Sequence, residues 1–162
     1  MEHILEAIIN HIGRNMPMIS TVDEDCGQLE FIDQDGKDTY PVIFPAVLVD
    51  SPDCDWSDIS ELNQIGKTSV RIRLALDVYD DTHYGCGTTQ KIRERMQLVH
   101  DLHEQLQGYR FEDSVLTRTQ SRFYTANHGI KVYEQTYSIR VHEEVDPGTE
   151  GISTPRIKVK IV

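Results

Sequence analysis

Histidine and cysteine side chains are the first candidates for chemistry in this sequence, which has seven histidines and three cysteines. His83 and Cys86 have an H-x-x-C spacing, but no second Cys or His pair lies at a zinc-site spacing from them. His100 and His103 are three residues apart, without the H-E-x-x-H order of metalloproteases. We interpret His103, on an apolar helical stripe, as a hydrogen-bonded core histidine. Two ligands do not make a site, so we expect no metal centre and no cofactor.

The acidic and nucleophilic patterns also fall short of a catalytic signature. Asp53 and Asp55 begin like an EF-hand calcium loop. Asp58 then stands where that loop requires glycine, and Gln64 stands where it requires a bidentate glutamate. The chain has no GxSxG elbow and no GxxxxGK(S/T) or GxGxxG phosphate loop. We therefore expect a protein that is not an enzyme, with a small metal-dependent hydrolase as the alternative from another class.

The negative charge is concentrated in one window of the chain. The formal net charge is −11, and residues 21–61 hold twelve acids and one base, whereas the rest holds fifteen of each. A protein that binds nucleic acid by neutralising phosphates needs a basic surface, which this composition argues against. The window is either a solvated, solubilising face or a surface that repels a polyanion.

Length and composition are typical of a single globular domain. The chain has 162 residues, 38% of them hydrophobic, and we expect one domain over residues 1–145. No window approaches the roughly 18 consecutive apolar residues of a membrane span, and the first residues do not resemble a signal peptide. We therefore expect synthesis in a cytoplasm, with Cys26, Cys54 and Cys86 as free thiols.

Hydrophobic periodicity predicts the elements that must position these residues. Apolar residues at helical spacing over residues 4–12 predict an N-terminal helix that Gly13 closes. Residues 29–32 indicate a short strand, and Asp35-Gly36 supplies turn chemistry for a hairpin after it.

The middle of the chain contains the clearest strand pattern. Residues 46–49 form an apolar run typical of a strand buried on both faces. Residues 50–64 indicate a polar acidic loop, with a helical turn near residues 57–62. Apolar and polar residues then alternate over residues 70–78, which predicts a strand that buries one face only.

A long helix is predicted to follow a glycine-bearing loop. Thr88 or Thr89 is a suitable N-cap, and Gly108 lies where a helix-ending glycine is expected. The apolar stripe of this helix consists of Ile92, Met96, Val99, His103 and Leu106.

Antiparallel strands are predicted to close the domain. Residues 115–118 and 121–125 look extended, residues 127–129 form a hairpin turn, and residues 133–141 alternate. The fold class is therefore α+β, a mostly antiparallel, mixed sheet packed by an N-terminal helix and one long helix, with a tethered C-terminal strand.

That last strand is predicted after a linker. Residues 146–155 are rich in Gly, Pro, Ser and Thr, which is typical of a flexible tether. Ile157, Val159 and Ile161 then alternate with lysines. Because an isolated strand is not stable, this arm adds to its own sheet, adds to the sheet of a neighbouring subunit, or remains a disordered tail.

The order of these elements resembles that of the minor tail protein U-like family, the tail-terminator or tail-completion proteins of long-tailed bacteriophages. The resemblance spans roughly residues 1–144 and depends on the N-terminal helix, the run FPAVLV, the acidic loop and the strand SVRIRLALDVYD. It also includes the helix ending in Leu106-Gln107-Gly108 and the closing antiparallel strands. The segment after residue 145 lies outside this pattern.

The resemblance implies a structural virion protein made in the bacterial host cytoplasm. Members of the family form a ring, usually of six subunits, that ends tail-tube polymerisation and joins the tail to the head connector. The implied partners are further copies of the chain, the tail tube protein and the head-tail connector protein, with no membrane. A head-tail connector or other neck protein is the alternative in the same setting.

DNA passes through such a ring without specific binding. An acidic lining would repel the phosphate backbone and keep the passage free. We therefore predict that five acids line the channel and that three apolar residues of the arm contact the next subunit. The acids are Asp50, Asp53, Asp55, Asp58 and Glu61, and the arm residues are Ile157, Val159 and Ile161.

Overall fold

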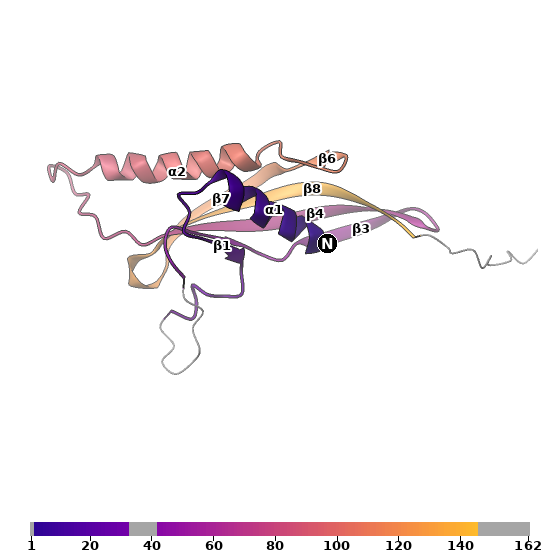
Figure 1. Ribbon diagram of the computed structural model, residues 1–162, viewed down its shortest axis with the longest axis horizontal. Coiled ribbons are helices and arrows are strands. Elements are labelled where there is room, and N and C mark those ends of the chain that lie inside the picture. Colours follow the sequence, from indigo (N-terminus) through magenta and orange to yellow (C-terminus); the bar gives the residue numbers. More distant parts are fainter. Residues whose placement is uncertain (1, 33–41, 146–162) are drawn as a thin grey trace, which may run out of the picture.

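A mixed β-sheet with helices packed on one face forms the framework of this computed structural model, which describes residues 2–32 and 42–145 (Figure 1). The elements are α1 (Glu2–Asn15), β1 (Thr21–Glu24), β2 (Ala46–Val49), β3 (Asp53–Ser60), β4 (Asn63–Leu76), α2 (Gln90–Leu106), β5 (Arg110–Phe111), β6 (Ser114–Val115), β7 (Thr117–Thr125), the 3₁₀ turn η1 (Asn127–Gly129) and β8 (Lys131–Glu144).

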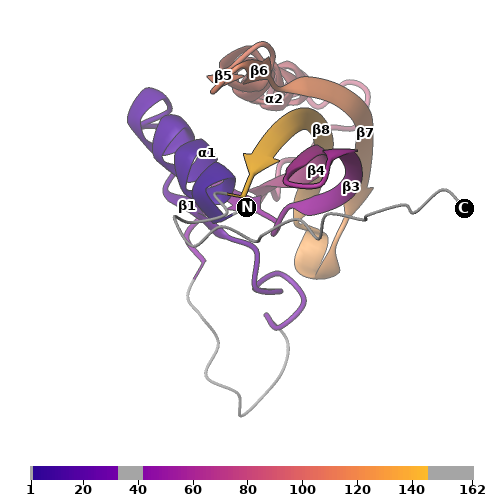
Figure 2. The same ribbon diagram turned by 90° about the vertical axis from the view of Figure 1, so that its right-hand side faces the viewer.

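Most neighbouring strands of this sheet are antiparallel. The strand order is β1-β2-β4-β8-β7, and β3 pairs with β4 on the same edge as β2. β1 and β2 are parallel, whereas β4 is antiparallel to β2, β3 and β8. Figure 2 shows the sheet curling from β4 through β8 to β7 toward α2. The predicted α+β class is confirmed.

Helix α1 packs its apolar side on the sheet, as its periodicity predicts. Ile4, Ile8 and Ile12 are at most 1% exposed, and each such burial contributes about 1.5–3 kcal/mol relative to exposure. Gly13 was expected to end the helix but lies within it, and the helix continues to Asn15. The φ of Gly13 is not positive, so its backbone stays helical.

The segment after α1 differs from the prediction. β1 was not predicted, because three of its four residues are polar and all four are only half-buried. The strand expected at residues 29–32 is wrong, since these residues form turns. Leu29 is buried there on the sheet face opposite the helices, where it packs in a small cluster with Ala75. The predicted Asp35-Gly36 turn lies outside the described residues.

Strand β2 is completely buried, as predicted for residues 46–49. β4 begins seven residues before the predicted strand, at Asn63. The expectation that it buries one face only is wrong for its second half, where Arg73 and Ala75 are also buried. A second hydrophobic cluster covers that face, and its buried members are Leu29, Leu48, Ala75, Ile130 and Val132.

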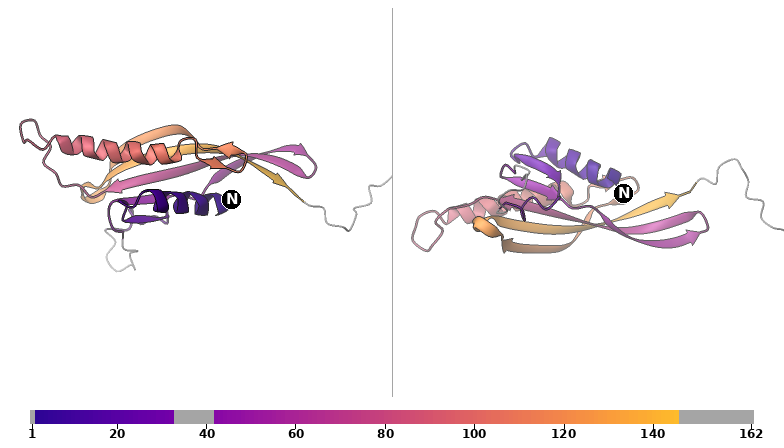
Figure 3. Two further views of the ribbon diagram at one scale, coloured as in Figure 1. Left: turned by 45° about the horizontal axis from the view of Figure 1, so that its top comes forward. Right: turned by 90° about the horizontal axis from the view of Figure 1, so that it is seen from below.

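The region predicted as an acidic loop is a β-hairpin. Residues 53–60 form β3, which pairs antiparallel with the first half of β4 through a turn at Glu61 and Leu62. The helical turn predicted near residues 57–62 is therefore wrong. β4 extends beyond the helices here, and its backbone groups need a second partner strand, which β3 supplies. Figure 3 shows this hairpin projecting past α1 and α2.

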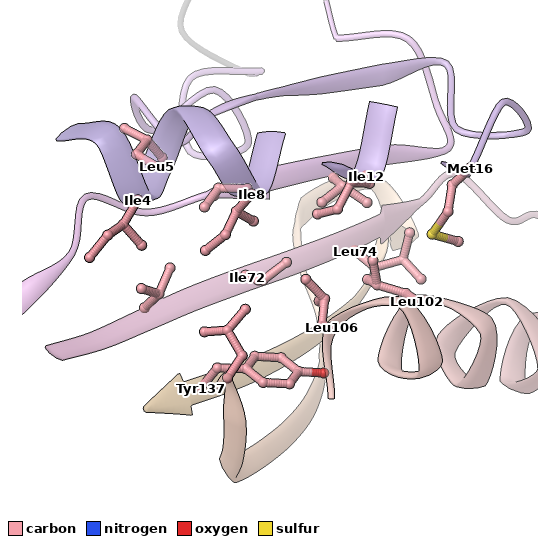
Figure 4. Close-up of a cluster of buried hydrophobic side chains, with 14 of the residues drawn as sticks. Ile4, Leu5, Ile8, Ile12, Met16, Ile72, Leu74, Leu102, Leu106 and Tyr137 are labelled. Atoms are coloured by element: carbon pink, nitrogen blue, oxygen red, sulfur yellow. The ribbon is translucent and has the colours of Figure 1, made fainter. Parts of the chain in front are cut away.

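Helix α2 packs only its C-terminal half. Leu102 and Leu106 are buried, whereas Ile92 and Met96 of the predicted stripe are 42% and 50% exposed. Thr89 stands at the predicted N-cap position, but its backbone is helical and its side chain makes no capping hydrogen bond. Gly108 follows the C-cap with φ +79°, as predicted. The buried side chains between the helices and the sheet are shown in Figure 4, with labels on Ile4, Leu5, Ile8, Ile12, Met16, Ile72, Leu74, Leu102, Leu106 and Tyr137.

His103 is half-buried and hydrogen-bonded, which confirms the prediction for this residue. Its Nδ1 lies 2.9 Å from the hydroxyl oxygen of Tyr137, which in turn donates to Oε1 of Gln135 at 2.5 Å. Burial lowers the pKa of His103, so the neutral imidazole is favoured. This polar chain fixes the end of α2 against β8.

The closing strands are confirmed. β7 and β8 form an antiparallel hairpin around η1, and a bulge between Arg118 and Gln120 explains why residues 115–125 read as two extended pieces. The first of those pieces begins at Val115, the last residue of β6, which pairs with β5. Cys26, Cys54 and Cys86 are all free thiols, as expected.

Side chains of β3 and β8 close tightly over Gly66 of β4. A Cβ atom added there would lie 2.7 Å from Cγ2 of Val141 and 3.0 Å from Cε3 of Trp56, and closer still to Sγ of Cys54. The middle of the projecting hairpin, where Gly66 pairs with Trp56, therefore requires a residue without a side chain.

We expect Gly66→Ala to lower the free energy of unfolding by about 1–3 kcal/mol, the usual cost of overpacking. Gly13→Ala is the matched control: its added Cβ meets no atom within 4 Å, and alanine in a helix is favoured over glycine by about 1 kcal/mol. Urea denaturation of both variants measures the difference. A Gly66→Ala protein as stable as Gly13→Ala would contradict this account of the packing at Gly66.

Candidate functional site: the acidic hairpin

The five candidate acids lie along a stretch from the end of β2 to the β3–β4 turn. Asp50 directly follows β2, three of the others lie on β3, and Glu61 lies in the turn. Asp50 is half-buried and the other four residues are exposed. The structure therefore places most of the predicted set on the projecting hairpin.

Asp50 does not belong with the exposed acids. Its Oδ2 forms an ion pair with Nη2 of Arg71 on β4, and its backbone N–H donates to the Arg71 carbonyl at 2.8 Å. The charge of Asp50 is therefore largely balanced at the surface of the sheet.

Strand alternation separates the acids of β3. Asp53 and Asp55 face the same side of the hairpin, opposite Ser69 and Lys67 of β4. Asp58 faces the other side, where its Oδ1 accepts a 2.7 Å hydrogen bond from Nε2 of Gln64. The five acids thus do not form one continuous surface, and their role as a channel lining stays a prediction.

The side that carries Asp55 also carries basic residues. Lys67 stands directly opposite Asp55, and Arg140 of β8 stands opposite Lys67. These three residues line a groove of about 700 Å³ between the hairpin and the β5–β6 turn, together with Arg110 and Asp113. The charge of this side is mixed rather than acidic.

The end of the hairpin is the most acidic part of the site. β8 ends beside the β3–β4 turn, and Glu143 stands opposite Gln64, in the same row as Asp58. Among the described residues, no ion pair neutralises the acids gathered here. We call this group the acidic tip; it consists of Asp58, Glu61, Glu143 and Glu144.

Sequence analysis missed Glu143 and Glu144 because they are some eighty residues from Asp58 along the chain. The signal that could have indicated them is the alternating pattern of β4 and of β8. Both strands have 14 residues, so if they pair along their full length, the end of β8 lies beside the start of β4. Only the register between β4 and β8 shows which residues meet.

Exposed apolar side chains accompany the acidic tip. Trp56 and Leu62 are each 38% exposed, Ile59 is 59% exposed and Ile65 is 37% exposed. Val145, whose N–H donates to the Leu62 carbonyl at 2.8 Å, is 58% exposed. Trp56 lies on the same side of the hairpin as Asp58, and Ile65 lies on the other side. Exposed apolar side chains on a projecting element suit a protein–protein contact.

Arg73 anchors the acidic segment before β2 to the sheet. Its Nε and Nη2 each lie 2.5 Å from a carboxylate oxygen of Asp25, and its Nη1 and Nη2 also contact Glu30. The side chains of Arg73 and Asp25 are 9% and 5% exposed. A bidentate arginine–carboxylate pair of this kind is both strong and geometrically specific.

The protonation behaviour of this cluster follows from the same contacts. Burial by itself lowers the pKa of Arg73, but the hydrogen bonds to Glu30 and Asp25 outweigh it and raise that pKa above its ordinary value. The hydrogen bond from Arg73 lowers the pKa of Glu30. Two acids of the predicted acidic window, Asp25 and Glu30, therefore share one arginine from outside it, which offsets one of their two charges.

Comparison with known proteins leaves the chain without an assigned family. No protein-family model matches it, and no curated protein matches it either. Across residues 2–32 and 42–145, neither α-helix has the length and apolar character needed to cross a lipid bilayer. The function has to be inferred from the fold and from the hairpin.

We expect Arg73→Met to lower the free energy of unfolding by about 3–5 kcal/mol, because it leaves Asp25 buried without its partner. Arg71→Met is the matched control: the Arg71 side chain is 53% exposed, so losing its pair with Asp50 should cost less than about 1 kcal/mol. Chemical denaturation measures both values. Equal losses in the two variants would show that the Arg73 cluster is not an anchor.

Proposed function

We propose that this chain is a structural virion protein that forms a ring on the end of a bacteriophage tail tube, ends tube polymerisation and joins the tail to the head connector. The order of elements on which the family resemblance depends supports this, including the strand-to-helix unit from β4 to Gly108. The observation that carries most weight is the projecting hairpin, with its exposed apolar side chains and its acidic tip.

The hairpin suits a contact between ring subunits. A ring needs a head-to-tail interface, in which one surface of a subunit meets a different surface of the next. An element that extends beyond its own core can reach a neighbour, and burying Trp56, Ile59 and Leu62 there would remove exposed apolar area from water. We assign the apolar side chains of the hairpin to this contact.

The acidic tip suits the wall of a passage for DNA. Carboxylates repel phosphates, whereas a basic wall would bind DNA and hinder its movement. Six copies of the tip around one pore would add their fields, so a modest repulsion per subunit becomes a large collective one. We restrict the proposed lining to the tip, because Asp50 is paired and Asp55 faces Lys67 and Arg140.

The C-terminal arm is proposed as a second link between subunits. Ile157, Val159 and Ile161 lie outside the described residues, so their role stays a prediction. Within residues 2–32 and 42–145, no strand pairs with the outer edge of β7. An arm with strand periodicity can satisfy its backbone hydrogen bonds by adding to such an edge in the next subunit.

We expect the full-length chain to form closed rings with a central hole, seen by native mass spectrometry and negative-stain electron microscopy. Replacing Ile157, Val159 and Ile161 by serine should leave monomers, because the arm then loses its apolar side. Replacing Lys158 and Lys160 by serine is the matched control and should leave rings intact.

Native mass spectrometry of the two proteins tests the ring function and the role of the arm separately. A full-length chain that stays monomeric at millimolar concentration would contradict the ring function. Rings that persist after all three apolar residues are replaced would contradict the role of the arm only.

We expect charge reversal in the acidic tip to make the rings retain DNA. The variant combines Asp58→Lys, Glu61→Lys and Glu143→Lys, and the retention of linear duplex DNA should weaken as salt is raised. The matched control reverses Glu94, Asp101 and Glu104 on α2, which changes the net charge equally. Electrophoretic mobility of the DNA measures both. Equal retention by the two variants would mean that the net charge of the ring, and not the position of the charges at the tip, determines whether DNA is retained.

A further inference from the structure

The loop between β4 and α2 gathers three side chains of different chemistry. Asp81, His83 and Cys86 each offer a donor atom, and these three atoms lie within 4.8 Å of one another. We propose that they form a binding site for Zn²⁺ or a closely similar transition-metal ion. The proposal does not depend on the ring function.

A tight turn brings His83 and Cys86 together. The backbone N–H of Cys86 donates to the His83 carbonyl at 3.2 Å, which closes a four-residue turn. Gly85, at its third position, has φ +87°, which the type II turn requires and which a side chain would disfavour. The H-x-x-C spacing therefore places both side chains at the two ends of one turn.

Asp81 completes the group from the residues before the turn. Its Oδ1 lies 2.6 Å from Nδ1 of His83 and accepts a 3.3 Å hydrogen bond from the His83 backbone N–H. Its carbonyl oxygen accepts hydrogen bonds from the Cys86 thiol, at 3.3 Å, and from the Thr88 hydroxyl. The loop is thus closed on Asp81 by residues that follow it, which holds the donors in place.

The donor set selects the class of ion. A thiolate, an imidazole and a carboxylate together suit Zn²⁺, with a fourth tetrahedral position left for water or another donor. Ca²⁺ and Mg²⁺ prefer oxygen ligands only. Exposed His83 and Asp81 leave the group open to an ion from solution.

The structure explains why sequence analysis stopped at two ligands. The D-x-H-x-x-C spacing contains a carboxylate where most zinc patterns have a second Cys or His. Only the folded loop shows that the Asp81 carboxylate turns toward His83 rather than toward solvent.

We expect the full-length protein to bind one Co²⁺ per chain with a near-ultraviolet thiolate-to-cobalt charge-transfer band that Zn²⁺ abolishes by displacement. Cys86→Ser should remove the band. His83→Ala and Asp81→Ala should weaken Co²⁺ binding by more than about tenfold, since even outer-shell partners contribute that much. Metal binding displaces protons from its ligands, so the affinity for Co²⁺ should fall as the pH is lowered.

Matched controls test whether the site is specific. Cys26→Ser, Cys54→Ser and His100→Ala should keep both the band and the affinity, and thermal unfolding of every variant checks that it is folded. A wild-type spectrum without the charge-transfer band would overturn the proposal. So would a band that survives in folded Cys86→Ser, or one that Cys54→Ser removes.

Discussion

The rest of the fold depends on the pairing and burial of strand β4. Both edges of its backbone need partner strands, and one row of its side chains must be buried under the helices. β8 pairs with it from end to end, while β3 and β2 share its other edge in succession. Val70, Ile72 and Leu74 must face the helices. A slip of one residue would expose this row and direct arginines into the core, so the register of the whole sheet is determined by burial.

The same alternation places arginines of β4 on the sheet face opposite the helices. Carboxylates of the acidic segment pair with these arginines. Arg73 lies in the row that the second hydrophobic cluster covers, and it is accommodated there because Asp25 and Glu30 supply carboxylates to its guanidinium. The negative window of the chain is therefore divided. Acids before β3 pair with arginines of β4, whereas among residues 2–32 and 42–145 no ion pair holds the acids at the end of the hairpin.

The two ends of β4 serve different chemistry. Its first residue lies next to the acidic tip. The exposed apolar side chains near the tip suit contacts with another protein. Beyond the last residue of β4 lies the loop of Asp81, His83 and Cys86, whose donors suit a metal ion. A 14-residue strand spans roughly 40 Å, so the two features are separated by most of the length of the sheet. A change at one end can be tested without disturbing the other.

Local patterns in the sequence determined the α+β class, helix α1, the buried strand β2, the core of β4, the end of α2 at Gly108 and the closing hairpin, because each depends on periodicity or on one glycine. Tertiary structure decided what depends on a distant partner. β3 is a strand only because β4 needs a neighbour beyond the core, and residues 29–32 form turns because Leu29 packs on the far side of the sheet. Glu143 joins Asp58 only through strand register, and Asp50 leaves the acidic set because Arg71 lies beside it. Spacing along a chain predicts local backbone conformation, whereas the neighbours of a side chain are set by which strands pair and in which register.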